Sequence, residues 1–270
     1  MPLKTGLILG PGALRGAYGA GVASVLGRHI DFYRIYGSSV GAFTATFLVT
    51  KQFDVMLDIW RNHVHGKLLI NFKNPLIGRN VLDTEYLTSL FKKEKHFLDL
   101  EKVSRERGRL NHVLTNCSSG EAEYLCPDGD SVFHGMIASS AIPYAHTAVK
   151  INGKYFYDGG LSDPYPLNKA INDGNDKVIV VSNFYSNYDP KPVYRFLQVA
   201  VRLEEKHENS IRFVEASSCI NSNVFLLRPS RQILNDVIDR DKSRINATID
   251  QGIEDAEQFL RCFKYTHMAG

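Results

Sequence analysis

The apolar residues of this chain fall into short runs separated by glycine-containing turns, which is typical of buried parallel strands. The first two runs cover residues 3–9 and 31–36, and each leads through a turn into a segment with helical character. Because two strand–turn–helix units come within the first fifty residues, the pattern predicts a parallel α/β sheet. Two later apolar runs, Lys177–Val181 and Val224–Leu227, predict further strands of the same sheet.

The middle of the chain reads differently. Residues 53–110 are expected to form mainly helices and loops, as a cap-like segment, with helices over 53–60 and over 81–91, where Asp83 begins the second helix. The apolar stretch 68–77 is broken by Pro75, and it is interpreted as a cap over a site or a lipid-facing edge, with core packing as the alternative.

Beyond this segment the pattern predicts a strand pair at 111–117 and 123–126, a helix over 136–142 that ends at Pro143, and a hairpin over 149–157. Two long amphipathic helices, 194–218 and 236–264, are expected to cover the sheet. No linker, repeat or low-complexity tract divides the chain, so residues 1–270 are predicted to form a single domain.

The net charge and the cysteine spacing limit the possible binding partners and the cellular location of the chain. The net charge of +3 is too small to predict nucleic-acid binding, although residues 61–112 carry eleven Lys/Arg against six Asp/Glu. That excess of positive charge predicts either binding to an anionic surface or a helical face exposed to solvent. The cysteines lack metal-type spacing, and we find neither a secretory signal nor an apolar run long enough to cross a bilayer. We expect reduced thiols, a cytoplasmic location and only peripheral membrane contact, and the oligomeric state is left open.

The strongest local motif is Gly37-Ser38-Ser39-Val40-Gly41, which comes between an apolar run and a helical segment. A glycine-x-serine-x-glycine turn of this kind is typical of a nucleophile elbow, where small neighbours let the backbone bend sharply around the serine. The alternative is a glycine turn with a serine that caps the next helix.

An earlier turn is rich in glycine: Gly10-Pro11-Gly12-Ala13-Leu14-Arg15-Gly16. Free backbone N–H groups at such a strand-to-helix turn bind anions. They could stabilise an oxyanion, or they could hold a dinucleotide, with Asp31 near the spacing of a ribose ligand. A plain tight turn is the third alternative.

A third candidate lies far along the chain. The predicted hairpin leads directly into Asp158-Gly159-Gly160, so the carboxylate comes at the end of a strand and could approach another loop closely. A turn aspartate that caps its own backbone is the alternative.

The three motifs, in this order, resemble those of the patatin-like phospholipases of the bacterial type, and the likeness covers nearly the whole chain. The resemblance implies a three-layer α/β sandwich with a mostly parallel central sheet and helices on both faces. It further implies a serine hydrolase that cleaves phospholipid or other acyl-ester lipids through an acyl-enzyme, with Ser39 as nucleophile, Asp158 as base and the glycine-rich loop as oxyanion hole. No metal or organic cofactor is implied.

The sequence departs from the family pattern in that loop, where three glycines are expected before the x-Arg-Gly. Pro11, Gly12 and Ala13 occupy these positions, and Pro11 has no N–H to donate. Gly12 and Ala13 can still donate, but Ala13 is confined if its position demands positive φ. A catalytically weakened binding protein is therefore one alternative function, and an NAD(P)-binding oxidoreductase that uses the same loop is another.

The expected chemistry also needs a shifted pKa. A free aspartate titrates near pH ~3.9 and is a poor base at neutral pH, so burial would have to raise the pKa of Asp158. A triad histidine is the rival base, and the candidates are His112, His134 and His146.

Overall fold

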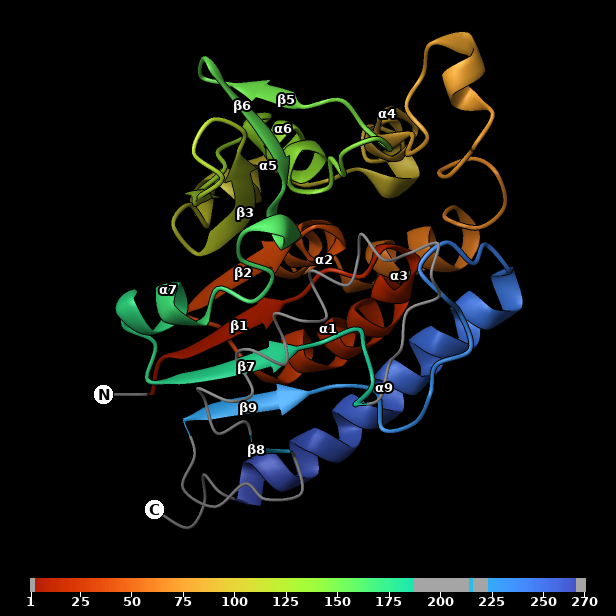
Figure 1. The fold of residues 1–270 in the computed structure, drawn as a ribbon. Helices are drawn as coiled ribbons and strands as arrows, with labels where there is room; N and C mark the ends of the chain where they lie inside the picture. Colours follow the sequence, from red (N-terminus) through yellow and green to blue (C-terminus); the bar gives the residue numbers. More distant parts are fainter. Residues whose placement is uncertain (1–2, 187–213, 216–222, 266–270) are drawn as a thin grey trace.

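The computed structural model describes residues 3–186, 214–215 and 223–265, and these form a nine-stranded sheet flanked by helices (Figure 1). The strand order is β5-β6-β3-β2-β1-β7-β9-β8, and β4 pairs with β3 off this path. The strands are β1 (Thr5–Leu9), β2 (Arg34–Ser38), β3 (Leu110–Asn116), β4 (Ala122–Leu125), β5 (Val149–Ile151), β6 (Lys154–Asp158), β7 (Lys177–Val181), β8 (Val214–Glu215) and β9 (Val224–Leu227).

The sheet is parallel from β3 through β2, β1, β7 and β9 to β8, and antiparallel where β3 meets β4 and β6 and where β5 meets β6. The chain adds β2 and then β3 on one side of β1, and β7 and β9 on the other. Such a reversal of strand order opens a crevice at the carboxyl ends of the central strands, where α/β proteins bind ligands. The mostly parallel sheet predicted from the sequence is confirmed.

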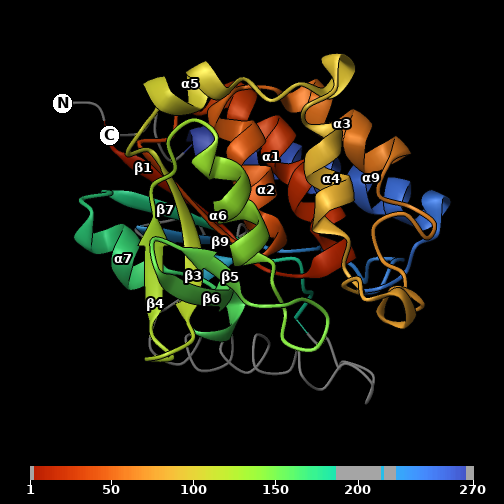
Figure 2. The same cartoon turned by 90° about the horizontal axis from the view of Figure 1, so that it is seen from above.

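Side chains of the central strands alternate between two cores. In β1, Leu7 and Leu9 pack into the larger core with the helices of one face, whereas Ile8 packs into a smaller core on the other face. The larger core is built with α1 (Ala17–His29), α2 (Val40–Val49), α3 (Phe53–Asn62) and α9 (Lys242–Tyr265), and the smaller with α7 (Leu167–Asn172). Figure 2 shows α7 across the sheet from α1 and α9. Helices therefore cover both faces.

Helix α1 packs along α9, and its residues 17–26 are all buried. Small side chains permit the close approach: a Cβ on Gly21 would lie 2.2 Å from the backbone oxygen of Ile249 in α9, and one on Gly252 would lie 2.3 Å from that of Tyr18. Helix α2, which follows Ser39, is apolar on all sides and buried almost throughout.

The segment after α3 contains short helices, as the sequence predicts. They are η2 (Asn74–Ile77), α4 (Thr84–Leu90), η3 (Glu94–His96) and α5 (Leu100–Arg105). The expected start of α4 is confirmed, because the Asp83 carboxylate accepts a hydrogen bond of 2.9 Å from the Tyr86 amide.

Two predicted helix boundaries are wrong. Helix α6 (Ser131–Ser139) lies earlier than expected, since the chain leaves the helix at Ser140, ahead of Pro143. Helix α9 begins at Lys242 rather than 236, because the Asp241 carboxylate accepts a hydrogen bond from the Arg244 amide at the first turn. The expected helix 194–218 falls mostly outside the described residues, and Val214–Glu215 within it form strand β8.

Candidate active site

Ser39 lies between strand β2 and helix α2, at a turn only one residue long. Its backbone has φ 56° and ψ −127°, a conformation that side-chain-bearing residues rarely adopt. Ser39 is the N-terminal flanking residue of α2, whose first N–H groups have no partner within the helix. The sharp turn and the helix that follows have the geometry of a nucleophile elbow.

The two glycines of the motif are required by close backbone contacts. A Cβ on Gly37 would lie 2.5 Å from the backbone oxygen of Gly41, and a Cβ on Gly41 would lie 2.0 Å from that of Leu9. Neither neighbour can move, because each belongs to the central sheet or to the first turn of α2. The Ser39 amide donates a 2.9 Å hydrogen bond to the hydroxyl of Ser139, which the sequence analysis did not single out.

The glycine-rich loop follows β1 and lies beside the elbow. Gly12 has φ 154° and Ala13 has φ 49°, so Ala13 occupies the strained left-handed region that the sequence analysis anticipated. The amide of Leu14 donates to Val237 and that of Arg15 to Gly12. Within the described part of the chain, the amides of Gly12 and Ala13 donate to no protein group. These two N–H groups are available to an anion.

Two buried side chains hold this loop. The Asn183 amide nitrogen donates to the carbonyl oxygens of Gly10 (3.0 Å) and Pro11 (2.9 Å), while its oxygen accepts from the Gly19 amide at 3.0 Å. The Arg15 guanidinium donates to the backbone oxygen of Asn183 at 3.1 Å. Asn183 was missed at the sequence level, because its only signal is a polar residue two positions after the buried strand β7.

Asp158 ends strand β6 and reaches Ser39 from the antiparallel side of the sheet. Both residues are only 4 % exposed. The Ser39 side chain lies close enough to the Asp158 carboxyl to lower its pKa, and the Gly160 amide donates to the same carboxyl at 2.7 Å. Gly159 and Gly160 permit this approach: a Cβ on Gly159 would lie 2.1 Å from the Val113 oxygen, and a Cβ on Gly160 would lie 3.3 Å from the Pro11 side chain. The fold therefore brings the three motifs together.

Burial changes the acidity of the carboxyl. Removal from water raises the pKa of Asp158 to about 7, and the nearby Ser39 hydroxyl and Gly160 amide oppose that rise only in part. A carboxyl with this pKa is half ionised near neutral pH, so it can accept and return a proton there.

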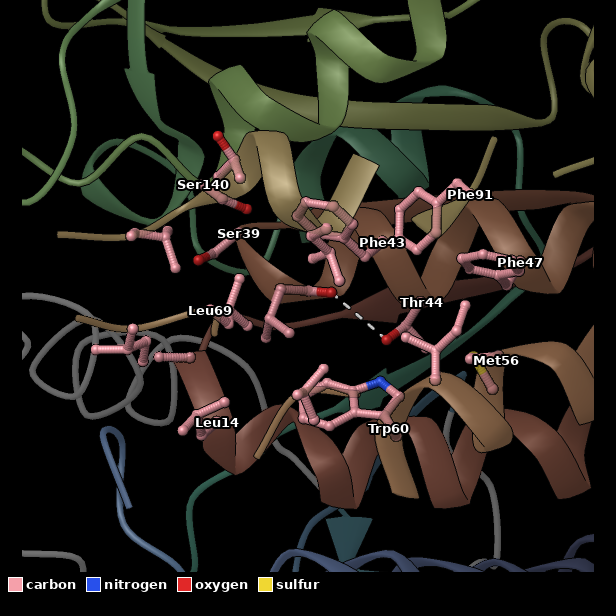
Figure 3. A pocket seen from close by; sticks show the side chains of 18 of the residues that line it. Leu14, Ser39, Phe43, Thr44, Phe47, Met56, Trp60, Leu69, Phe91 and Ser140 are labelled. Atoms are coloured by element: carbon pink, nitrogen blue, oxygen red, sulfur yellow. Dashed lines mark hydrogen bonds between the residues drawn. The ribbon is translucent and has the colours of Figure 1, made fainter. Parts of the chain in front are cut away.

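A cavity lined almost entirely by apolar side chains extends from Ser39 between α2, α3 and α4 (Figure 3). Its empty space is about 710 Å³, counting the open solvent at the mouth. In the figure, Ser39 and Ser140 lie at one end, and Phe47 and Met56 lie at the other. The wall is completed by Leu14, Phe43, Ile59, Trp60, Leu69, Ile70, Leu82, Leu87, Phe91 and Ile142.

The apolar stretch 68–77 contains residues that fit the cap and core-packing interpretations and residues that face solvent, and its role as a lipid-facing edge stays a prediction. Leu69 and Ile70 are buried and line the cavity, so they cover the site. Leu68, Phe72 and Leu76 are exposed. Because buried and exposed residues alternate within this one stretch, the sequence alone could not distinguish a cap over the site from an exposed edge.

The rival residues have other partners. His112 is fully buried beneath α2, where its Nε2 lies 2.9 Å from the Thr46 hydroxyl, and burial lowers the pKa of His112 to about 3. His146 contacts Thr84 and Thr147, and His134 is exposed. Asp31 precedes β2, at the opposite end of the strand from the glycine-rich loop, and pairs with Arg109 at 2.8 Å.

The described residues contain one group with metal-ligating atoms close together: Asp58, His63 and His96, within 4.8 Å of one another. The Asp58 carboxylate is already engaged, since one oxygen accepts from Asn62 and the other contacts both His96 and Lys95. None of the three lines the cavity at Ser39. Cys117, Cys126 and Cys262 are free thiols, while Cys219 lies outside the described residues.

A search against protein families matches residues 7–171 to the family described as "Patatin-like phospholipase". The match includes the glycine-rich loop, the elbow and Asp158, and it covers more than half of the chain. The chain belongs to the patatin-like phospholipase family. Within the described ranges, no helix combines the length and the hydropathy needed to cross a bilayer.

Curated relatives of this patatin-like chain are distant. It is 31 % identical over 195 residues to human patatin-like phospholipase domain-containing protein 2, covering 66 % of this chain and 35 % of the relative. It is 23 % identical over 231 residues to the uncharacterized protein YjjU of Escherichia coli (strain K12), covering 79 % and 64 % respectively. The chain thus spans less than two thirds of the length of either relative.

The fold has a solved counterpart. The crystal structure of VipD from Legionella pneumophila aligns with a TM-score of 0.54 at 15 % sequence identity, over 96 % of this chain and 67 % of that one. The TM-score shows a shared fold, and the patatin-like architecture expected from the sequence is confirmed.

Proposed function

We propose that this chain is a serine esterase that hydrolyses acyl esters of lipids, with Ser39 as nucleophile and Asp158 as general base. The proposal is carried by one observation: the buried Ser39 lies beside the Asp158 carboxyl, whose pKa is raised to about 7, at one end of an apolar cavity. Membership of the patatin-like phospholipase family supports a lipid substrate. No step of the proposed reaction calls for a metal or an organic cofactor.

The reaction proceeds in two halves. The Ser39 oxygen attacks the ester carbonyl carbon while Asp158 takes its proton, and collapse of the tetrahedral intermediate breaks the bond to the alcohol oxygen. Asp158 returns the proton to the departing alcohol, which leaves an acyl group on Ser39. Water then attacks the acyl-enzyme, gives a proton to Asp158, and releases the fatty acid as Ser39 recovers its proton.

Negative charge on the tetrahedral intermediate needs donors beside Ser39. The unengaged amides of Gly12 and Ala13 are the proposed oxyanion hole, with the Val40 amide at the start of α2 as a further donor. Removing one such donor typically costs ~3 kcal/mol of transition-state stabilisation. Asn183 is a positioning residue in this scheme, since its side chain binds the carbonyl groups of Gly10 and Pro11 in the loop.

The apolar lining of the cavity supports an acyl chain as its ligand. Its wall is apolar along its length, and Met56 and Phe47 lie far from Ser39 (Figure 3). Each methylene transferred from water to such a wall gains ~0.8 kcal/mol. The geometry disfavours a dinucleotide at the glycine-rich loop, because Tyr165 and Asn183 fill the space against Gly10 and Gly12 and Asp31 lies at the far end of β2.

Labelling with a fluorophosphonate tests the nucleophile. We expect the wild type and Ser38→Ala to be labelled, and Ser39→Ala to remain unlabelled. Ser38 is the matched control: it is the neighbouring serine, it is fully buried, and its hydroxyl has no partner within the described residues. Labelling that persists in Ser39→Ala would overturn the assignment.

Hydrolysis of a short p-nitrophenyl ester tests the base and the weakened alternative. Asp158→Asn should lose about 10³-fold or more in kcat/KM, as is typical when a general base is removed from a serine hydrolase. A full rate in Asp158→Asn would rule out the dyad. Labelling of wild type without any turnover of esters would favour the weakened binding protein suggested by Pro11 and Ala13.

A further inference from the structure

Four large apolar side chains on one short segment are exposed to solvent. Leu68, Phe72, Leu76 and Ile77 are 55 %, 57 %, 84 % and 70 % exposed. They lie within ten residues, on the orange segment that projects from the body of the molecule at the upper right of Figure 1. We call residues 67–80 the apolar lobe. Side chains of this size are rarely clustered on a soluble surface without a partner.

The lobe is held against the cavity. The Asn71 amide donates to the Val81 oxygen at 2.9 Å, Ile70 and Leu82 form a β-bridge, and the Arg240 guanidinium donates to the Ile70 oxygen at 2.8 Å. Ile70 and Leu82 both line the cavity that leads to Ser39. The exposed face of the lobe is therefore fixed at the outside of the cavity wall.

A second loop extends the same apolar surface. The Leu82 amide donates to the Ala145 oxygen at 3.3 Å, and the Thr147 amide donates to the Asn80 side chain at 3.1 Å. The tip of that loop is Tyr144, whose side chain is fully exposed at φ 68°. Ile142, at the base of the loop, lines the cavity. A tyrosine in this position has the apolar body and polar tip that suit a membrane–water interface.

The distribution of charge around the lobe distinguishes between a second copy of this chain and a lipid surface as the partner. Between residues 61 and 82 the sequence has four Lys/Arg and no Asp or Glu. Arg79 pairs with Asp83 at 2.9 Å, whereas Lys67 and Lys73 are exposed and form no ion pair within the described part of the chain. A symmetric contact between two copies of this chain would bring like charges together. Apolar residues flanked by uncompensated lysines instead match an anionic lipid surface.

We propose that the apolar lobe and Tyr144 dock this protein on the surface of an anionic lipid bilayer. Leu68, Phe72, Leu76 and Ile77 enter the boundary between headgroups and acyl chains, and Lys67 and Lys73 contact the headgroup phosphates. Docking in this orientation turns the outside of the cavity wall toward the lipid, so that an acyl chain has a short path to Ser39. This last consequence rests on the proposed function, while docking itself does not.

Sedimentation with vesicles measures docking without catalysis, using Ser39→Ala as the parent. We expect at least tenfold tighter binding to vesicles of phosphatidylcholine and phosphatidylglycerol than to phosphatidylcholine alone, and weaker binding at high salt. The pair Leu76→Ser/Ile77→Ser should lower affinity for the anionic vesicles at least tenfold, and Lys67→Glu/Lys73→Glu should do the same.

Matched controls come from the opposite end of the sheet. Ile171 in α7 is 49 % exposed, so Ile171→Ser removes a comparable apolar side chain outside the lobe. Lys4 and Lys51 are exposed near the amino-terminal ends of β1 and β2, so Lys4→Glu/Lys51→Glu repeats the charge reversal there. Binding should change less than twofold in both controls. Equal losses in lobe and control variants would overturn the proposal.

Insertion has a direct readout because Trp60 is the only tryptophan of the chain. In a Trp60→Phe background, the emission of Leu76→Trp should shift to shorter wavelength on anionic vesicles and be quenched by brominated lipid, while Ile171→Trp should show neither change. An unshifted emission from Leu76→Trp would overturn insertion. A dimer in light scattering that Leu76→Ser/Ile77→Ser abolishes would assign the lobe to self-association instead.

The active enzyme separates this proposal from the proposed function. For Leu76→Ser/Ile77→Ser with Ser39 intact, the ratio of vesicle hydrolysis to short-ester hydrolysis should fall at least tenfold. If fluorophosphonate labelling fails while vesicle binding follows the lobe variants, docking stands and the esterase assignment falls. If labelling succeeds but the lobe variants bind vesicles like their controls, the reverse holds.

Discussion

The two ends of the cavity are built in different ways. At the sheet, Ser39 and Asp158 are held by backbone packed against backbone, as where Gly41 meets Leu9 and Gly159 meets Val113. Along the wall formed by residues 53–98, short helices and loops face the cavity with side chains such as Met56 and Trp60. At the sheet end of the cavity, no space remains for an added side chain. In the wall, by contrast, side chains can be replaced while the backbone keeps its path.

Under the proposed function, this contrast corresponds to different tasks in the two regions. Bond-making chemistry needs fixed positions, and backbone hydrogen bonds at the ends of parallel strands supply them. Recognition of an apolar chain needs a surface of suitable size, and many combinations of apolar side chains supply it. Substitutions at the sheet end of the cavity should therefore abolish folding or catalysis, and those in the wall should change the preference for acyl-chain length.

The largest effect is expected for Gly41→Ala. Its Cβ would lie 2.0 Å from the Leu9 backbone oxygen, so we expect a loss of ~4 kcal/mol or more in the free energy of unfolding, measured by urea denaturation. Gly66→Ala is the matched control, since a Cβ there meets nothing within 4 Å and only its φ of 73° is unfavourable, at ~1 kcal/mol. Equal stability in both variants would contradict the contrast.

The next effect concerns the pH dependence of activity. The base must be ionised, and the pKa of Asp158 is raised to about 7 by burial, so kcat/KM for an uncharged short ester should fall about tenfold per pH unit below pH ~7. His112 cannot produce this limb, because burial lowers its pKa to about 3. His146→Gln should leave the limb unchanged. A limb near pH 4 would mean that the pKa of Asp158 is not raised.

The same carboxyl should reduce stability at neutral pH. Its pKa is higher in the folded state than in the unfolded chain, so the unfolded state binds fewer protons between pH ~4 and ~7 and stability falls as pH rises through that window. Asp158→Asn removes this dependence. Above pH ~7 the variant should therefore be more stable than the wild type by on the order of 4 kcal/mol in urea denaturation, and the gain should vanish near pH 4.

In the wall, Met56→Ala should lengthen the cavity at the end far from Ser39. We expect the ratio of kcat/KM for long-chain over short-chain p-nitrophenyl esters to rise about fivefold, with a loss of ~2–3 kcal/mol in unfolding free energy. Ile245→Ala, a buried residue of α9 away from the cavity, is the control for general destabilisation. A similar change of preference in that control would contradict a role for the wall.

The smallest effect is expected for Ala13→Gly. Ala13 has φ 49°, which glycine adopts without the steric cost of a Cβ. We expect a two- to fivefold gain in kcat on short esters, because the loop amides reach the oxyanion position with less strain. A decrease in kcat would indicate that the alanine methyl group holds the loop in place.

Sequence reasoning predicted the strands of the central sheet because their pattern is local: buried runs end in turns that only glycine can form. The same reasoning predicted the sharp turn at Ser39, since that turn needs glycine at positions 37 and 41, while the role of Ser39 as nucleophile stays a prediction. It misplaced the start of α9, where Asp241 caps the helix, because a cap depends on a hydrogen bond that composition does not specify.

By itself, the sequence determined which residues could react and which turns would present them, because steric limits on the backbone act between neighbours along the chain. Only the tertiary structure decided that Asp158 reaches Ser39, that Asn183 holds the glycine-rich loop, and that Leu69 faces the cavity while Leu68 faces solvent. The raised pKa of Asp158 belongs to the same group, because desolvation depends on atoms supplied by distant strands and helices.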